Sequence, residues 1–446
     1  MTHPVHDFAA VGLGPFNLGL ACLTEPIEDL DGVFLEQAPR FEWHPGLLIE
    51  GATLQTPFMA DLVTLADPTS PYSFLNYAKR QGRLYSFYIR EDFFLLRTEY
   101  NRYCQWAAEQ VSGIEFSTRV DWIERDESRD CYRLHATDTR TGEARVYHAR
   151  RLVLGTGTVP VVPPCCRGLD GPAIHASDYL GHRETLQGRD WITVVGSGQS
   201  AAEVFHDLLA DRERHGYGLS WITRSERFFP LDYSRLTLEL TSPEFIDYMH
   251  GLPHTRREEL MREQRALYKG IDQDLIARIR DLLYTRSVDR EPPVELRTNS
   301  ALQRAFREPG GGYELQFEHV EEGVSFSHRT DALVLATGYS HRVPAFVEGI
   351  ADRIRWDDAG RYDVARDYSI DHGGDEIFVQ NAELHTHGFV APDLGMGPYR
   401  NACIIRALTG VEHYPIEQRI AFQRFGAPEP EPEPVAQSPQ PREEVC

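Results

Sequence analysis

Short apolar runs that end in glycine-rich turns recur along the chain and predict its main elements. Residues 7–11 form such a run, and the apolar segment 18–23 follows the turn with the spacing of a helix. A second apolar run, residues 32–35, comes next. A buried strand, a glycine turn, a helix and a second strand, in this order, are typical of the first half of a dinucleotide-binding fold.

The same order returns in the middle of the chain. The run 191–195 predicts a strand, the turn 196–198 opens a helix, and the run 219–223 predicts the next strand. Between the two copies, aromatic residues at helical spacing predict helices over 71–110. Alternating apolar and polar residues predict strands over 116–153. We therefore expect two dinucleotide sites in one chain.

These patterns predict an α/β fold with two Rossmann-like dinucleotide-binding domains and a helical insertion that contributes to the substrate site. The first domain is expected to comprise residues 1–186 and 331–426, and the second residues 187–330. The insertion, at about 228–285, has a helical pattern with prolines as breaks. Residues 427–446 are acidic and proline-rich, which predicts a disordered tail.

The first glycine turn carries the features of an FAD site. Gly12 and Gly14 let the backbone approach a pyrophosphate at the helix N-terminus, although Asn17 replaces the third glycine of the usual fingerprint. Glu36 ends the next strand, where a carboxylate binds ribose hydroxyls. The aromatic loop with Trp43 and His44 either folds over the flat cofactor or is an ordinary loop.

The second glycine turn has the GxGxxA form, and the strand after its helix ends in Arg224. A guanidinium there suits the 2′-phosphate of NADPH, whereas an acidic residue would favour NADH. Glu226 could pair with Arg224 and weaken this preference. The expected cofactor contacts of this turn and of the later Ala-Thr-Gly-Tyr turn are Gly196, Ser197, Gly198, Gln199, Ser200, Thr337 and Gly338.

Composition narrows the function further. The chain has 446 residues and a net charge of −22, which argues against a nucleic-acid partner. It contains no apolar run of about 18 residues and begins without a secretory signal, so we expect neither a membrane helix nor export. Seven cysteines without a CxxC pair favour the cytoplasm. His385 and His387 lack further ligands at metal-binding spacing, so no metal is expected.

The lack of a redox cysteine pair also bears on the reaction. Two dinucleotide sites usually pair FAD at the first turn with a nicotinamide at the second, and a disulfide reductase would pass electrons to a cysteine pair. Without such a pair, molecular oxygen is a leading acceptor. The pattern therefore favours a monooxygenase.

The motifs resemble those of the flavin-dependent N-hydroxylating monooxygenases of siderophore biosynthesis, the lysine, ornithine and diamine hydroxylases. The resemblance covers residues 7 to 410 approximately. The matching motifs are GLGPFNL at 12–18, WHPG at 43–46, LQT at 54–56, DLV at 61–63, PYSF at 71–74, GSGQSA at 196–201, ATGY at 336–339 and THG at 386–388. They include Pro15 of the first turn as a further cofactor contact.

The resemblance implies a known catalytic cycle. NADPH reduces FAD, oxygen adds at the flavin C4a, and the hydroperoxide transfers its terminal oxygen to the terminal nitrogen of a primary amine while NADP⁺ stays bound. Gln55 is implied to lie beside the flavin and to help orient it with NADP⁺. The partners are then a small aliphatic amine and O₂, and the family suggests a homo-oligomer, often a tetramer.

One departure from the family pattern concerns the substrate. The amino-acid hydroxylases usually carry a lysine just before Asp-Leu, which binds the substrate carboxylate, and Ala60 stands there in this chain. By a looser alignment, the asparagine of the ornithine enzymes falls near Leu238. Because alanine cannot neutralise a buried carboxylate, a diamine such as putrescine or cadaverine is favoured. Asp393 is the first candidate to bind its far ammonium, and Glu239 the second.

Other interpretations remain open. A basic residue elsewhere could compensate for Ala60, which would make the protein an L-lysine N6- or L-ornithine N5-monooxygenase. A generic flavin monooxygenase for sulfides or ketones fits the motifs less well. A non-catalytic redox sensor could also bind two dinucleotides, although Gln55 and Arg224 argue against it. The length of the diamine cannot be read from the sequence.

Overall fold

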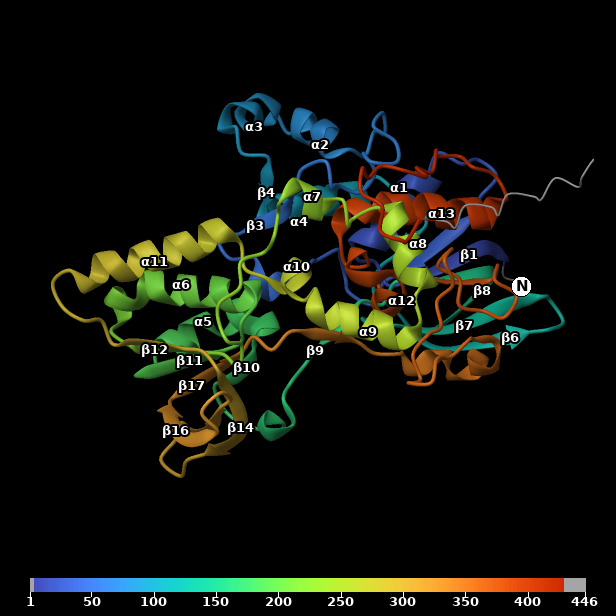
Figure 1. The fold of residues 1–446 in the computed structure, drawn as a ribbon. Helices are drawn as coiled ribbons and strands as arrows, with labels where there is room; N and C mark the ends of the chain where they lie inside the picture. Colours follow the sequence, from blue (N-terminus) through green and yellow to red (C-terminus); the bar gives the residue numbers. More distant parts are fainter. Residues whose placement is uncertain (1–3, 429–446) are drawn as a thin grey trace, which may run out of the picture.

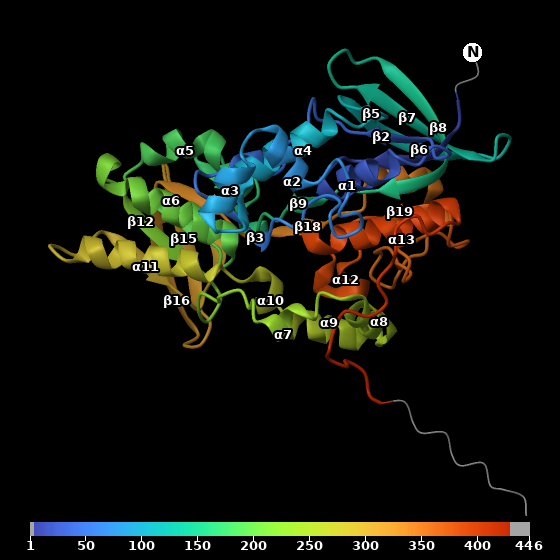
Figure 2. The ribbon, with the colours of Figure 1, turned by 90° about the horizontal axis from the view of Figure 1, so that it is seen from above.

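Two β-sheets, each covered by helices, lie side by side in the computed structural model, which describes residues 4–428 (Figures 1 and 2). The first sheet is mixed, since β7 pairs antiparallel with both β6 and β8. The first sheet has the order β5-β2-β1-β8-β7-β6, and β19 pairs with β8. Its strands are β1 (His6–Val11), β2 (Gly32–Leu35), β5 (Ile114–Glu115), β6 (Thr118–Asp126), β7 (Cys131–Asp138), β8 (Ala144–Leu154) and β19 (Ile377–Val379). The predicted α/β fold is confirmed.

The first strand shows why such runs are apolar throughout. Phe8 and Ala10 pack against α1 (Pro15–Thr24) and α13 (Gly397–Thr409), whereas Ala9 and Val11 pack on the opposite face, in the cluster that includes Ile350. Both faces of a parallel strand are covered, so apolar residues do not need to alternate with polar ones.

The second sheet is parallel throughout, with the order β10-β17-β11-β12-β13. Its strands are β10 (Ala173–His175), β17 (Ala332–Leu335), β11 (Trp191–Val195), β12 (Gly218–Ile222) and β13 (Val294–Arg297). Helices α5 (Tyr179–Gln187) and α6 (Gln199–His215) pack on it. An antiparallel sheet joins this unit; its strands are β14 (Ser300–Arg307), β15 (Tyr313–His319) and β16 (Val324–Thr330).

The domain bounds predicted from the sequence are corrected by the sheet order. β10, α5 and β17 belong to the second unit, although they fall inside the predicted ranges 1–186 and 331–426. The chain therefore crosses between the units at about 155–172 and 336–344. There β9 (Thr158–Pro160) pairs with β18 (Tyr339–His341) as an antiparallel ribbon, seen between the two units in Figure 2.

The predicted helical stretch 71–110 is interrupted. The helices are α2 (Phe74–Arg80), α3 (Leu84–Arg90) and α4 (Arg97–Ala108). Between the last two lies β4 (Phe94–Leu96), which pairs with β3 (Thr53–Pro57), the strand that carries Gln55. Aromatic and aliphatic residues in this short run satisfy a strand as well as a helix, so the pattern alone did not separate them.

The helical insertion is shorter than predicted. Its helices are α7 (Arg235–Leu238), α8 (Pro243–Gly251), α9 (His254–Glu263) and α10 (Ala266–Lys269). The next helix, α11 (Gln273–Ser287), packs on α6 and belongs to the second unit. Pro243 and Pro253 mark where α8 and α9 begin, since proline suits the start of a helix. Helices α8 and α9 contact α12 (Leu384–His387) of the first unit.

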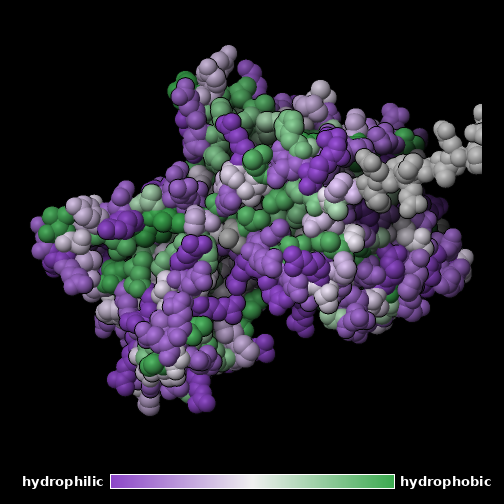
Figure 3. Space-filling view, viewed as in Figure 1, coloured by the Kyte–Doolittle hydropathy of each residue, from purple (hydrophilic) through white to green (hydrophobic). Residues whose placement is uncertain are grey.

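The visible surface is mixed in character. Hydrophilic side chains cover most of the face in Figure 3. Val288, immediately after α11, is an exposed apolar residue. Within residues 4–428, no helix is both long and apolar enough to cross a membrane. The predicted tail, 427–446, lies outside the described residues from 429 onward.

Candidate active site

The first glycine turn holds a backbone that no other residue type would allow. Gly12 has φ +87°, and a Cβ there would lie 2.5 Å from the carbonyl oxygen of Gly155. Gly14 caps α1, and a Cβ on it would meet nothing within 4 Å. The helix N-terminus therefore opens onto free space with its first amides unpaired, which is the geometry that receives a pyrophosphate.

Replacement of Gly12 tests this turn. Because Gly12→Ala adds a clash to a strained φ that costs about 1–3 kcal/mol, the FAD content of the purified protein is expected to fall to about a tenth of wild type or less. Gly51→Ala is the matched control, since Gly51 has φ +77° in open space and lies outside the turn. Equal FAD content in the two variants would contradict the assignment; flavin absorbance after heat release provides the measurement.

Glu36 lies where a ribose would be bound, at the end of β2. Its two carboxylate oxygens accept hydrogen bonds from the amides of Leu13 and Ala38, each at 2.7 Å. The buried side chain of Asn17 donates to the Gly12 carbonyl at 2.7 Å and accepts from Gln380 at 2.7 Å. Both ends of the amide therefore stabilise the turn, and the cofactor contact of Asn17 stays a prediction.

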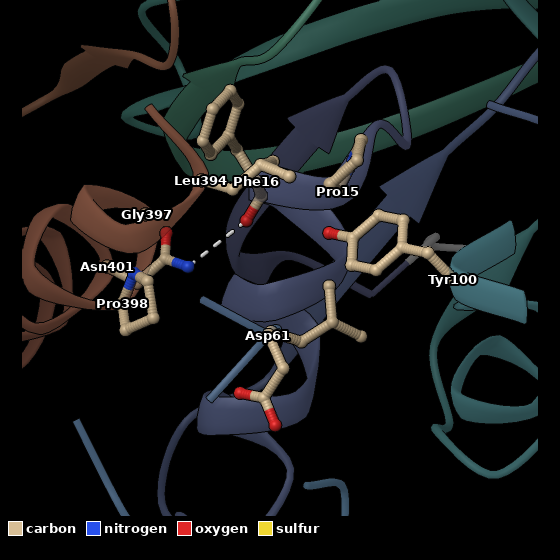
Figure 4. Close-up of a pocket in the computed structure, with 9 residues that line it drawn as sticks. Pro15, Phe16, Asp61, Tyr100, Leu394, Gly397, Pro398 and Asn401 are labelled. Atoms are coloured by element: carbon tan, nitrogen blue, oxygen red, sulfur yellow. Dashed lines mark hydrogen bonds between the residues drawn. The ribbon is translucent and has the colours of Figure 1, made fainter. Parts of the chain in front are cut away.

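A small pocket lies between two helix N-termini in Figure 4. Pro15 and Phe16 come from α1, whereas Gly397, Pro398 and Asn401 come from α13. The Asn401 amide donates to the Phe16 carbonyl at 3.1 Å, and its buried Oδ1 has no hydrogen-bond partner among the described residues. The pocket therefore presents an unpaired acceptor beside the first turns of two helices, and a ligand that carries a donor would satisfy it.

Asp61 also lines this pocket, but its carboxylate makes hydrogen bonds to the loop that carries it. In Figure 4 its carboxylate points away from the helix N-termini. It accepts from the amides of Val63, Thr64 and Phe74 and from the Thr64 hydroxyl at 2.7–3.0 Å. The DLV motif is thus explained by loop geometry.

Several buried polar atoms on β3 and around it make no hydrogen bond within the described chain. Gln55 Nε2, Thr56 Oγ1 and the Tyr339 hydroxyl are buried without a hydrogen bond within the described chain. Trp43 packs edge-on against Tyr100, with ring centroids 5.2 Å apart. The ring of His44 lies 5.7 Å from that of Tyr339. Unsatisfied buried polar atoms are costly, so a ligand with donors and acceptors is expected there, and FAD fits this requirement.

The second glycine turn is built like the first. Gly196 has φ +150°, and a Cβ there would lie 2.2 Å from the Ala336 carbonyl oxygen. Gly198 caps α6, with Ser197 before it and Ser200 half-buried in the first turn of the helix. Gln199 is already occupied: it donates to Glu203 at 2.7 Å and accepts from the Asp272 amide at 2.8 Å. It thus shapes the turn.

The Ala-Thr-Gly-Tyr turn at 336–339 makes hydrogen bonds that hold its own surroundings together. The Thr337 hydroxyl donates to the Val161 carbonyl on the opposite crossing segment. The Gly338 carbonyl accepts from the Val161 amide at 2.9 Å and lies 3.2 Å from His175 Nε2. These two predicted cofactor contacts therefore join the crossing segments to each other.

Three cations gather beside the second turn. Partial burial and the guanidinium groups of Arg265 and Arg224 lower the pKa of Lys269. The Lys269 carbonyl oxygen would lie 3.5 Å from a Cβ on Gly198, so α10 stands next to the turn. In the described part of the chain, none of the three cations has a carboxylate within ion-pair distance, and Glu226 lies nearest to Arg227 instead. Unpaired cations suit a phosphate group.

Arg224→Ser is expected to raise the KM for NADPH about tenfold and to leave the KM for NADH unchanged, because a charge-assisted contact to the 2′-phosphate is lost. Arg227→Ser removes the neighbouring exposed cation and serves as control. Steady-state oxidation of both nucleotides measures the effect. A parallel loss for NADPH and NADH would show that Arg224 does not read the 2′-phosphate.

Two of the predicted substrate residues lie together. A Cβ on Gly395 would stand 3.0 Å from Asp393 Oδ1 and 3.7 Å from the Ala60 Cβ. Asp393 Oδ1 accepts the Gly395 amide at 2.7 Å, and burial raises the pKa of the Asp393 carboxyl. Ala60 is buried. The negative charge of Asp393 also acts on Tyr233 of the insertion, which therefore lies nearby.

The other two predicted substrate residues lie elsewhere. Leu238 is 45% exposed. Glu239 accepts from the backbone amide and the side-chain amide of Gln423 at 3.0 and 3.1 Å. Glu239 Oε2 therefore holds the C-terminal segment, which favours Asp393 as the partner of the ammonium. Sequence reasoning could not see this, because 184 positions separate the partners.

His387 of the THG motif and His385, which precedes the motif, are packed in the interior. His387 is buried and stacks on Tyr368 at 4.7 Å, and burial lowers its pKa well below the usual value. His385 lies 2.8 Å from the Tyr362 carbonyl. Among residues 4–428, no cluster of three or more histidine, cysteine or carboxylate side chains could hold a metal ion.

Comparisons with known proteins find a matching family model and similar relatives. The model of the L-lysine 6-monooxygenase/L-ornithine 5-monooxygenase family matches residues 4–341. Putrescine N-hydroxylase of Shewanella oneidensis is 51% identical over 421 residues, which are 94% of this chain and 84% of the relative.

Two solved structures extend the similarity to the whole fold. The FAD-bound cadaverine monooxygenase DfoA of the desferrioxamine pathway, from Erwinia amylovora, is 55% identical, with a TM-score of 0.94 and coverage of 96% of this chain and 100% of that one. The ornithine N-hydroxylase KtzI of Kutzneria, with reduced FAD, NADP⁺ and L-ornithine, is 27% identical, with a TM-score of 0.83 and coverage of 91% and 99%.

Proposed function

The chain belongs to the L-lysine 6-monooxygenase/L-ornithine 5-monooxygenase family, and from this premise we propose that it hydroxylates one terminal amine of a small aliphatic diamine. The reaction uses FAD, NADPH and O₂, and its product serves the synthesis of a hydroxamate siderophore. Putrescine and cadaverine are the proposed substrates, as they are the amines named for relatives at 51% and 55% identity.

The cofactors define what the protein must supply. When bound, FAD takes electrons from NADPH and activates O₂ for transfer to nitrogen. Gly12 and Gly14 admit the pyrophosphate, Glu36 binds the ribose, and Gln55 presents its unpaired amide to the flavin side of β3. Arg224, with Arg265 and Lys269, holds the 2′-phosphate of NADPH. These residues bind and orient, and they exclude water from the reacting atoms.

The reacting amine must lose its proton before it can attack. A free alkylammonium has a pKa of about 10.4, so the protein has to favour the neutral form by removing it from water. The far amine stays protonated and needs a negative partner, and the Asp393 carboxylate provides that charge. Burial disfavours the charged form of this carboxylate, and an ammonium partner restores it.

The juxtaposition of Ala60 and Asp393 carries the proposal for a diamine. An acidic and a small apolar side chain stand together where the amino-acid hydroxylases have a lysine. A substrate carboxylate there would face Asp393 without a cation, which costs several kcal/mol. A second ammonium would be stabilised.

The organisation of the protein follows from the same assignment. We propose that the first sheet unit binds FAD, that the second binds NADPH, and that the insertion from 228 to about 270 covers the substrate. The predicted homo-oligomer and the cytoplasmic location remain proposals. Size measurement by light scattering of the purified protein addresses the first, and cell fractionation addresses the second.

A single assay tests the assignment of cofactors and substrate class. The purified protein, reconstituted with FAD, is expected to oxidise NADPH faster when putrescine or cadaverine is added, and to release a hydroxylamine. Stimulation by lysine or ornithine alone would preserve the chemistry and overturn the diamine. Failure of every amine to yield a hydroxylamine, with NADPH turned over to peroxide, would overturn both.

A further inference from the structure

A buried ion pair ties the two sheet units together. Arg97 is the first residue of α4, in the first unit, and Glu203 follows the second glycine turn on α6. Arg97 Nη1 lies 2.7 Å from Glu203 Oε2, and the two side chains are only 13% and 4% exposed. The partners are 106 positions apart, so tertiary structure alone brings them together.

Each end of the pair is anchored at a cofactor site. The Arg97 amide donates to the Ala52 carbonyl at 2.9 Å, immediately before β3, which carries Gln55. Glu203 Oε1 accepts from Gln199 at 2.7 Å, and Gln199 in turn accepts the Asp272 amide at 2.8 Å. One chain of contacts thus connects the flavin side of β3, the second glycine turn and the first residues after the insertion.

The covalent connections between the units are weak restraints. The strands of the two crossing segments pair over three residue pairs, Thr158 to Pro160 with Tyr339 to His341, and Val161 adds hydrogen bonds to Thr337 and Gly338. Pro160 has no amide hydrogen to donate. A short two-stranded ribbon of this kind is marginally stable by itself. Leu47 and Ile49, which lie in the loop before β3, pack into the core of the second unit, but apolar packing of this kind is not directional.

We propose that Arg97 and Glu203 are positioning residues that hold the second glycine turn, and the nucleotide bound on it, at the distance from the flavin that hydride transfer requires. The inference rests on the proposed function. Reacting atoms must approach within about 3–3.5 Å, and a displacement of about 1 Å can cost roughly 100-fold in rate. A directional, buried ion pair sets such a register better than apolar packing does.

The variants Arg97→Met and Glu203→Gln test this ion pair, which we call the clasp. Glutamine has nearly the same shape as the glutamate it replaces. Arg183→Met is the matched control, because Arg183 lies 2.7 Å from Asp207 on the same helix α6, with both partners inside the second unit. Anaerobic reduction of FAD by NADPH is followed by stopped flow, together with the ratio of hydroxylamine to peroxide. Arg97→Lys tests whether a shorter cation rescues the rate.

We expect Arg97→Met and Glu203→Gln to reduce FAD about 10–100-fold more slowly at saturating NADPH and to divert oxygen to peroxide. Arg183→Met keeps the wild-type rate, and Arg97→Lys recovers part of the loss. Without cofactors, limited proteolysis cuts the crossing segments 155–172 and 336–344 faster in the two clasp variants than in the control.

Three results would overturn the clasp. The first is a wild-type reduction rate in Arg97→Met and Glu203→Gln, and the second is a loss no larger than that of Arg183→Met. The third is unchanged proteolysis of the crossing segments. If the wild-type protein itself does not reduce FAD with NADPH, the proposed function and the clasp fail together. If wild type is active and the variants match it, the clasp alone fails.

Discussion

Asp393→Asn is expected to raise the KM for the diamine about 10–100-fold while NADPH oxidation in the absence of amine stays unchanged. A hydrogen bond to a charged group contributes about 1.5–3 kcal/mol, which corresponds to this range. Asparagine keeps an oxygen that accepts the Gly395 amide, so the loop retains its shape while the charge is lost. Steady-state kinetics of hydroxylamine formation provide the measurement.

Glu239→Gln is the control for this effect. Its carboxylate binds Gln423 near the surface, so the KM for diamine is expected to remain at the wild-type value. A rise in KM in Glu239→Gln but not in Asp393→Asn would reverse the two assignments. A loss of flavin in Asp393→Asn would show that Asp393 supports the fold of the FAD site instead of the substrate.

Arg400→Met is expected to destabilise the protein by about 3–5 kcal/mol, because it leaves a buried carboxylate without its cation. Arg400 on α13 lies 3.1 Å from Glu383, and the two side chains are 1% and 0% exposed. The guanidinium also donates to the Ala391 carbonyl at 2.6 Å and stands 4.5 Å from the centre of the Phe16 ring. Its loss should therefore loosen the pocket of Figure 4 and lower FAD affinity as well.

Thermal unfolding of the holoprotein measures this loss. Arg353→Met is the matched control, since Arg353 pairs with Glu376 at 2.8 Å and the two side chains are 32% and 27% exposed. Exposed pairs contribute about 1 kcal/mol or less. The double variant Arg400→Met with Glu383→Leu should recover much of the stability, because the unpaired charge is gone. A melting temperature for Arg400→Met equal to that of the control would disprove the buried-pair account.

The sequence predicted those parts of the fold that depend on local pattern. Both glycine turns could be located from the sequence, because Gly12 and Gly196 occupy backbone positions that exclude a side chain. Such a position requires glycine, so a single residue shows it. The parallel strands were found because both of their faces are covered, which leaves a run of apolar residues. The fold class and the family motifs followed from these features.

The remainder depends on contacts between distant segments. The returning segment brings Gln380 to Asn17, a contact that the sequence pattern does not show. In the same way, packing brings the Gln423 amide to the Glu239 carboxylate from a distant segment. Arg97 and Arg400 lie in segments without a recognisable motif, and Glu203 follows the second glycine turn. The partners of all three are set by packing alone. The insertion was predicted too long because the pattern of α11 does not say which sheet it covers.

A competition experiment tests the central claim most directly. The FAD-loaded protein is given NADPH and an equimolar mixture of putrescine, cadaverine, lysine and ornithine, and the N-hydroxylated products are quantified by mass spectrometry. The account predicts that nearly all hydroxylamine derives from the two diamines, because Ala60 and Asp393 offer no partner for a carboxylate. A product mixture dominated by N-hydroxylysine or N-hydroxyornithine would contradict it.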